Sequence, residues 1–200
     1  MITTRCEDGL ASLLADIRRC RICAEALPHE PRPVLRAETT ARLMICGQAP
    51  GTRVHATGIP FNDPSGVRLR EWLGMDSETF YDSSRIAIVP MGFCFPGQDG
   101  KGGDLPPRRE CAPAWHEKIR AHLPDIGLTV LVGRYSQAFY LRTDAGALTD
   151  TVRNWRRFMP DFFPLPHPSW RNNAWLNRNP WFAEEVLPEL RRAVHSVLTG

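Results

Sequence analysis

Lysine is scarce in this chain of 200 residues: it occurs only at Lys101 and Lys118, and every other Lys/Arg position is arginine. The formal net charge is only +3, so charge alone says little about partners. A planar guanidinium suits bidentate phosphate contacts, although a genome that favours arginine codons explains the surplus equally well. Arg171 and Arg178, which lie in a polar region, indicate phosphate binding more strongly than the total does.

Long apolar runs are absent as well. None approaches the roughly 20 residues needed to span a bilayer, so we expect no membrane partner. The segment Met1–Asp8 lacks the basic start and apolar core of a signal peptide, which predicts a cytoplasmic location. The GxxxxGK[ST], HExxH and Ser-His-Asp patterns are missing too, which argues against nucleotide hydrolysis, zinc peptidase and serine hydrolase chemistry.

Short apolar segments predict buried strands. They are Leu43–Cys46, Ile86–Val89, Leu128–Val132 and Phe162–Leu165. Helices are predicted over residues 10–19, 113–123, 136–141, 149–158 and 183–198, and after a Ser65 cap with Val67, Leu69, Trp72 and Leu73 facing inward. Strands that alternate with helices indicate one domain over residues 1–200, a three-layer α/β/α sandwich around a mostly parallel four-stranded sheet.

Two polar loops follow predicted strands. The first, Gly47–Gly51, reads Gly-Gln-Ala-Pro-Gly, and the second, His167–Trp170, reads His-Pro-Ser-Trp. Loops at the carboxyl ends of parallel strands converge on one crevice, where ligands bind. The glycines let the backbone approach a ligand closely, and the second loop presents an imidazole, a hydroxyl and an indole together. These loops therefore predict a functional site.

Four of the six cysteines form two pairs, Cys20-x2-Cys23 and Cys94-x16-Cys111. Four thiolates hold either a tetrahedral zinc ion or an iron–sulfur cluster, and the alternative is that some or all remain unligated. Cys46 lies within an apolar strand, so we expect it to be a small buried hydrophobe.

The motifs, taken in their order, resemble those of the uracil-DNA glycosylase superfamily. They are Cys20-x2-Cys23, Gly47-Gln-Ala-Pro-Gly51, the Gly-x-Pro-Phe-x4-Gly pattern of residues 58–66, the pair Cys94 and Cys111 across a Pro/Arg loop, and His167-Pro-Ser169. The resemblance covers nearly the whole domain and is closest to the iron–sulfur branch, family 4. The second cysteine pair is one residue wider than that branch would have, so the chain resembles a relative within the superfamily.

This resemblance implies a monofunctional DNA glycosylase of base excision repair, which hydrolyses the N-glycosidic bond of a flipped-out uracil or other deaminated base. The implied partner is DNA that contains a damaged or deaminated base, and we expect a monomer. The implied cofactor is a [4Fe-4S] cluster held by Cys20, Cys23, Cys94 and Cys111, with structural zinc or no metal as the alternatives.

The resemblance also implies a role for each residue of the site. His167 would hydrogen-bond the base O2 as negative charge develops there, and Phe61 would stack on the base. Gln48, Ala49 and Met91 would contact the base, Pro50, Gly51, Pro168 and Ser169 would hold the DNA backbone, and Trp170, Arg171 and Asn172 would enter the vacated space.

Two departures from the family pattern bear on activity. Related enzymes carry a carboxylate in the first loop, where this chain has Gln48 and Ala49; Asp63 is the nearest substitute, with a simple turn-forming role as the alternative. Pro90 stands where family 4 has an asparagine that reads the uracil edge. A non-catalytic module that binds damaged or single-stranded DNA is therefore the second hypothesis, and a hydrolase of free nucleosides or RNA is the third.

Overall fold

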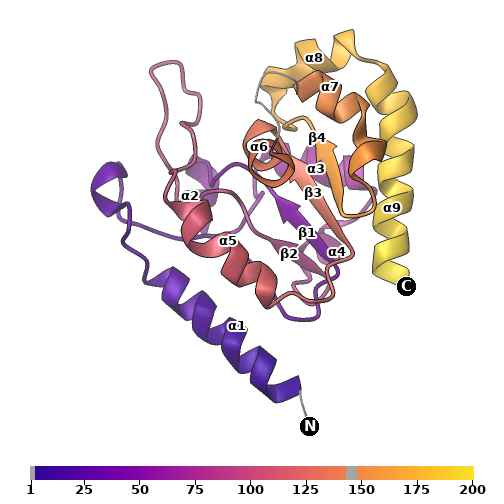
Figure 1. The fold of residues 1–200 in the computed structure, drawn as a ribbon. Coiled ribbons are helices and arrows are strands. Elements are labelled where there is room, and N and C mark those ends of the chain that lie inside the picture. The colour runs from indigo at the N-terminus through magenta and orange to yellow at the C-terminus, as the bar shows by residue number, and fades with distance from the viewer. Residues whose placement is uncertain (1–2, 143–147) are drawn as a thin grey trace.

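The computed structural model describes residues 3–142 and 148–200. At its centre lies a sheet of four strands in the order β2-β1-β3-β4, and every ladder between these strands is parallel (Figure 1). The strands are β1 Leu43–Cys46, β2 Ile86–Ile88, β3 Leu128–Val132 and β4 Phe162–Leu165. All of them lie where apolar runs predicted strands, and the predicted α/β/α sandwich is confirmed.

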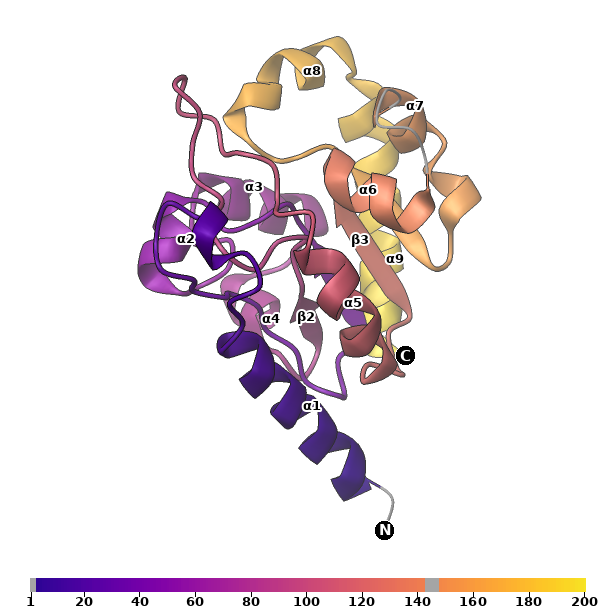
Figure 2. The ribbon, with the colours of Figure 1, turned by 60° about the vertical axis from the view of Figure 1, so that its left-hand side comes forward.

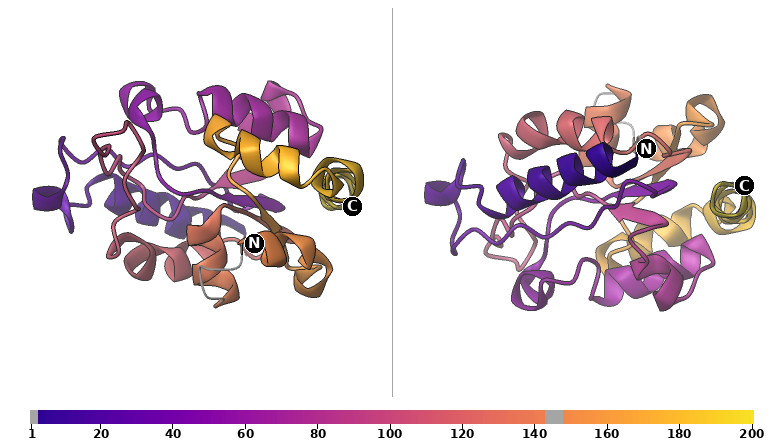
Figure 3. Two further views of the ribbon diagram at one scale, coloured as in Figure 1. Left: turned by 90° about the horizontal axis from the view of Figure 1, so that it is seen from above. Right: turned by 90° about the horizontal axis from the view of Figure 1, so that it is seen from below.

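The side chains of β1 alternate between two hydrophobic cores, one on each face of the sheet. Leu43 and Ile45 belong to one core, and Met44 belongs to the other. Figure 3 shows the helices as layers on the two sides of the sheet. One layer contains α1 Thr3–Arg18, α5 Cys111–Ala121 and α6 Arg134–Leu141, and the other contains α3 Pro64–Leu73, α4 Ser77–Tyr81 and α9 Leu187–Thr199.

Shorter elements complete the described part of the chain. They are the helices α2 Thr52–Thr57, α7 Leu148–Arg153 and α8 Asn173–Arg178, the 3-10 turns Ala24–Ala26, Trp155–Phe158 and Trp170–Asn172, and a π-helical turn Phe182–Val186 that leads into α9. The helices α2, α4 and α8 were not predicted, because so few residues carry no helical periodicity. No helix among the described residues is both long and apolar enough to cross a membrane.

The start of α3 corrects two expectations. Asp63, rather than Ser65, caps the helix: its Oδ1 accepts a hydrogen bond of 2.8 Å from the Gly66 N–H. Pro64 then occupies the first turn, where its missing N–H costs nothing. Val67 was expected to face inward, but it is 49% exposed, because it lies two positions before the buried Leu69 and so on the other side of the helix.

Candidate active site

One cavity of about 90 Å³ lies beside the carboxyl ends of the strands. His167 from the loop after β4 and Phe61 from the segment before α3 both line it, although they are far apart in sequence. The other side chains of interest around it are Gln48, Ala49, Pro50, Asp63, Ser65, Pro90, Asp104 and Ser169. The structure therefore brings together residues from both predicted loops.

One ring nitrogen of His167 already accepts a hydrogen bond from the protein. Its Nδ1 accepts a hydrogen bond of 3.2 Å from the Ser169 N–H, so a neutral ring carries its proton on Nε2. Burial lowers the pKa of His167 below its ordinary value, while the charges of Asp63 and Asp104 act in the opposite direction. The neutral ring is thus favoured, and it offers an Nε2–H donor. The Asn172 side chain donates to the His167 carbonyl at 2.7 Å and fixes the loop.

Phe61 is fixed by its backbone and by two neighbours. Its φ of 53° lies in the left-handed region, which few residues other than glycine adopt. The ring lies so close to Gly47 that a Cβ there would stand 2.9 Å from the Phe61 Cζ. The ring also packs edge-on against Phe80, with centroids 6.0 Å apart. Phe61 is therefore a positioned aromatic surface at the cavity.

Two carboxylates line the cavity, but neither belongs to the first loop. Asp63 uses one oxygen to cap α3, as described above. Asp104 was not predicted; it follows the glycine-rich segment 97–103 and comes within 3.1 Å of the position that a Cβ on Gly51 would occupy. The sequence carries no signal for Asp104, because its place at the cavity depends on contacts between segment 97–105 and the distant first loop.

Comparison with known proteins identifies the family of this chain. A family model described as the uracil DNA glycosylase superfamily matches residues 35–191. The chain belongs to this superfamily. The solution structure of a candidate uracil DNA glycosylase from Methanosarcina acetivorans is 14% identical and has a TM-score of 0.44, and the match covers 80% of this chain and 98% of that one. The family match is to the superfamily as a whole, so family 4 remains a prediction.

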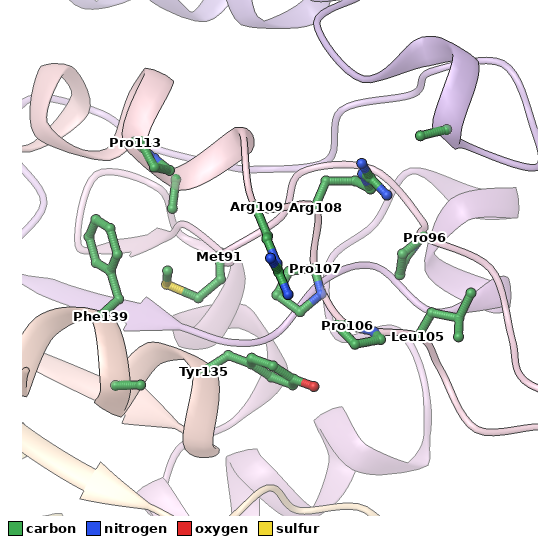
Figure 4. Close-up of a pocket in the computed structure, with 13 residues that line it drawn as sticks. Met91, Pro96, Leu105, Pro106, Pro107, Arg108, Arg109, Pro113, Tyr135 and Phe139 are labelled. Carbon is green, nitrogen blue, oxygen red and sulfur yellow. The ribbon is translucent and has the colours of Figure 1, made fainter. Parts of the chain in front are cut away.

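Met91 does not line the cavity of this superfamily member, contrary to the expectation that it contacts the base. It is buried and lines a separate, larger groove of about 1000 Å³ with Tyr135 and Phe139 (Figure 4). Its backbone N–H donates to the Gly47 carbonyl at 2.9 Å. Met91 therefore stabilises the first loop through its backbone, while its side chain faces the separate groove.

The predicted DNA-contacting residues divide into an inner and an outer group. Pro50, Gly51 and Ser169 line the cavity, whereas Pro168 is buried and does not line it. Trp170 is 69% exposed, and the Arg171 guanidinium lies 5.2 Å from the centre of its ring. Arg171 also donates to the Lys101 carbonyl at 3.2 Å, which joins this loop to the projecting glycine-rich segment (Figure 2). The outer group thus presents an aromatic ring and positive charge beside the cavity.

The four predicted cysteine ligands line a second, smaller cavity. Burial raises the pKa of Cys94 to about 11 and that of Cys111 to about 12. In residues 3–142 and 148–200, no three His, Cys, Asp or Glu side chains lie close enough to hold a metal ion. The donor set is nevertheless chemically coherent, because four soft sulfur atoms from two segments meet at one cavity.

A buried histidine, His116, contacts the backbone of Pro90, one of the residues that line the cavity. The His116 Nδ1 lies 2.8 Å from the Tyr140 hydroxyl, and its Nε2 lies 2.9 Å from the carbonyl of Pro90, which lines the cavity. A carbonyl only accepts, so Nε2 carries the proton, and the tyrosine donates to Nδ1. His116 is neutral in this arrangement, and burial lowers its pKa to about 4.

This histidine should make folding acid-sensitive. Its pKa of about 4 lies below the ordinary 6.5, so between these values the unfolded chain binds a proton that the folded chain does not. The contribution of His116 is therefore complete above pH 6.5 and is lost as the pH falls toward 4. As the pH falls from 6.5 to 4, the free energy of unfolding should fall by about 2 to 3 kcal/mol more in wild type than in His116→Gln.

Urea unfolding at several pH values measures this difference. His195→Gln, at an exposed histidine, is the control and should behave like wild type. Equal acid sensitivity of His116→Gln and wild type would contradict the prediction.

Proposed function

We propose that this protein hydrolyses the N-glycosidic bond of a flipped-out uracil or other deaminated base in DNA and leaves an abasic site. The observation that carries the proposal is the pairing of His167 and Phe61 at one cavity beside the carboxyl ends of the strands. Membership in the uracil DNA glycosylase superfamily supports the reaction class.

The chemistry requires stabilisation of two opposite charges. As the bond breaks, positive charge develops on the sugar and negative charge develops on the departing base. A hydrogen-bond donor fixed in advance at the base oxygen lowers this barrier without reorganisation. His167 provides such a donor, because the Ser169 N–H occupies Nδ1 and leaves the proton on Nε2. A neutral ring suits this role, since it donates a hydrogen bond without protonating the base.

The base and the DNA strand would be held by different surfaces. The Phe61 ring offers one face for stacking, and stacking is insensitive to base identity. Gln48 already donates to the Leu105 carbonyl at 3.1 Å, which leaves its amide oxygen as the acceptor. Pro50, Gly51 and Ser169 would contact the strand beside the flipped nucleotide. Trp170, Arg171 and Asn172 would fill or border the gap that it leaves.

A base-release assay tests the proposal directly. Purified protein is incubated with oligonucleotides that contain uracil, xanthine or hypoxanthine, in single-stranded and double-stranded form, and abasic sites are revealed by alkaline cleavage. We expect release of at least one of these bases. Absence of release from every oligonucleotide would reject the enzymatic function.

A non-catalytic DNA-binding module is the second candidate. Gln48 and Ala49 favour it, because the first loop then has no carboxylate, and Pro90 favours it, because its side chain cannot donate to a base edge. Such a module would bind lesion-containing DNA with a steep salt dependence, since phosphate contacts release counterions. Tight salt-sensitive binding without base release would decide in its favour.

We also propose that Cys20, Cys23, Cys94 and Cys111 hold a [4Fe-4S] cluster. In support, all four line one cavity, so four soft sulfur atoms from two segments of the chain meet there. Four cysteine thiolates are the ligand set of a [4Fe-4S] cluster, and structural zinc is the alternative. A cluster bound there would tie the Cys20–Cys23 segment to the loop between Cys94 and Cys111 and so stabilise the fold.

Colour and metal content test this cluster. We expect wild type purified without oxygen to be brown, with visible absorption that bleaches under a strong reductant. Cys94→Ser should lose most of the iron, because one of the four ligands is gone. Cys46→Ala is the matched control: Cys46 is buried in β1 and does not line the cavity, so its replacement should leave the iron content unchanged. Colourless wild type with stoichiometric zinc would contradict the cluster.

A further inference from the structure

Asp104 occupies a position in the active-site cavity that no sequence motif assigns. We propose that Asp104 is the catalytic carboxylate that replaces the one missing from the first loop. This inference rests on the proposed glycosylase function and adds a residue to it.

A hairpin delivers Asp104 to the cavity. Gln98 and Asp104 form an antiparallel bridge, and the Leu105 N–H donates to the Gly97 carbonyl at 2.9 Å. Asp99 closes the tip, because its Oδ1 accepts from the backbone N–H groups of Lys101 and Gly103 at 2.9 and 2.8 Å. The glycine-rich segment 97–103 is therefore a turn that returns the chain to the first loop.

The returning strand of this hairpin is attached to the first loop. The Gln48 amide donates to the Leu105 carbonyl, which is next to Asp104 in the chain. On the other side, the Asp104 Oδ2 lies 3.1 Å from the place of a Cβ on Gly51. Any larger residue than glycine would crowd the carboxylate there. The first loop thus holds the aspartate from both of its ends.

The Asp104 carboxylate is oriented by a hydrogen bond and is not paired with a cation in the described part of the chain. The Gln98 amide donates to the Asp104 Oδ1 at 3.2 Å and orients it. No lysine or arginine among the described residues forms a salt bridge with Asp104. An oriented and unneutralised carboxylate is suited to stabilise a developing positive charge and to accept a proton from water.

Asp63 is the competing carboxylate. It lines the same cavity, and its charge acts on His167 more strongly than that of Asp104 does. Its Oδ1, however, is used by the cap of α3, where it bonds the Gly66 N–H. Asp63 thus bonds the backbone N–H that starts a helix, whereas the Asp104 carboxylate accepts from the Gln98 side chain.

The step balances with water as the only co-reactant. The bond between the sugar C1′ and the base nitrogen breaks, and its electron pair leaves with the base, whose oxygen is stabilised by the His167 Nε2–H. A water oxygen forms the new bond to C1′. Asp104 accepts the proton that this water loses, and solvent later protonates the free base. No oxidant, reductant or further group is needed.

The test compares Asp104→Asn with wild type under single-turnover conditions on the oligonucleotide that wild type cleaves fastest. We expect the rate of base release to fall about 100-fold, the lower end of what a general base contributes. Binding to the same DNA with a non-hydrolysable 2′-fluoro nucleotide should stay within about threefold, because Asp104 lies in the cavity and forms no salt bridge with a lysine or arginine in the described part of the chain. Circular dichroism checks that the variant folds.

Asp99→Asn is the matched control. It removes one negative charge from the same hairpin but keeps an oxygen for the Lys101 and Gly103 N–H groups. Its rate should match wild type. A wild-type rate in Asp104→Asn, or a loss of DNA binding as large as its loss of rate, would overturn the role of Asp104 and leave the glycosylase function standing. An inactive wild type would reject both proposals.

Discussion

Replacement of His167 by alanine should lower the single-turnover rate of base release about 100- to 1000-fold, the usual loss when one positioned donor to a developing oxyanion is removed. The physical reason is that, in the proposed mechanism, the donor acts only as charge accumulates on the base. DNA binding should change little, because that mechanism assigns His167 to the transition state and not to contacts with the DNA strand. Rapid-quench measurement of abasic sites, combined with fluorescence anisotropy for binding, separates these two quantities.

His195→Ala is the appropriate control for this experiment. His195 is an exposed histidine on α9 that does not line the cavity, so its replacement should leave the rate unchanged. His167→Asn tests the same idea more finely, because an amide donor of different length occupies the loop. If the alanine variant releases base at the wild-type rate, His167 has no part in the chemistry.

Gly66→Ala should be the most damaging small substitution for the fold. A Cβ at this position would stand 1.7 Å from the Phe61 carbonyl oxygen and 2.8 Å from the Phe61 Cβ. Gly66 is buried, and both its neighbours in this clash are parts of one fixed residue, so backbone must move. We expect a loss of about 3 kcal/mol in the free energy of unfolding, the upper end of the usual cost of overpacking. Urea denaturation followed by circular dichroism measures it.

Gly100→Ala provides the comparison for Gly66→Ala. A Cβ on Gly100 would meet nothing within 4 Å, and this residue lies at the exposed tip of the hairpin. Its unfolding free energy should stay within about 0.5 kcal/mol of wild type, as is usual for surface positions. Equal stability of the two variants would show that the contact between residues 61 and 66 relaxes without cost.

Local patterns predicted the strands and the place of the site. Each strand is a short apolar run buried on both faces, and the loops that follow parallel strands meet at one edge of the sheet. Local patterns did not identify the residue that caps α3, because Asp63 and Ser65 are both of a type that caps helices. The proline between them decides the outcome, because proline is favoured in the first helical turn.

Other features depended on contacts between distant segments. Met91 directly follows Pro90, which lines the cavity, yet its own side chain lines the groove beside α6. Asp104 lies beyond a glycine-rich turn whose return path is set by the first loop, more than fifty residues earlier in the chain. Residue type and spacing predict neither position, because both depend on hydrogen bonds between segments that are distant in the sequence.

The hydrogen bond from Gln48 to Leu105 joins the first loop to the returning strand of the hairpin before any nucleotide enters. A contact that is already made releases no further free energy when DNA binds. The cost of unstacking a base, a few kcal/mol, must then be met by other contacts or by weakness in the duplex itself. A mismatched or single-stranded nucleotide, which is already loosely held, would accordingly be admitted most easily.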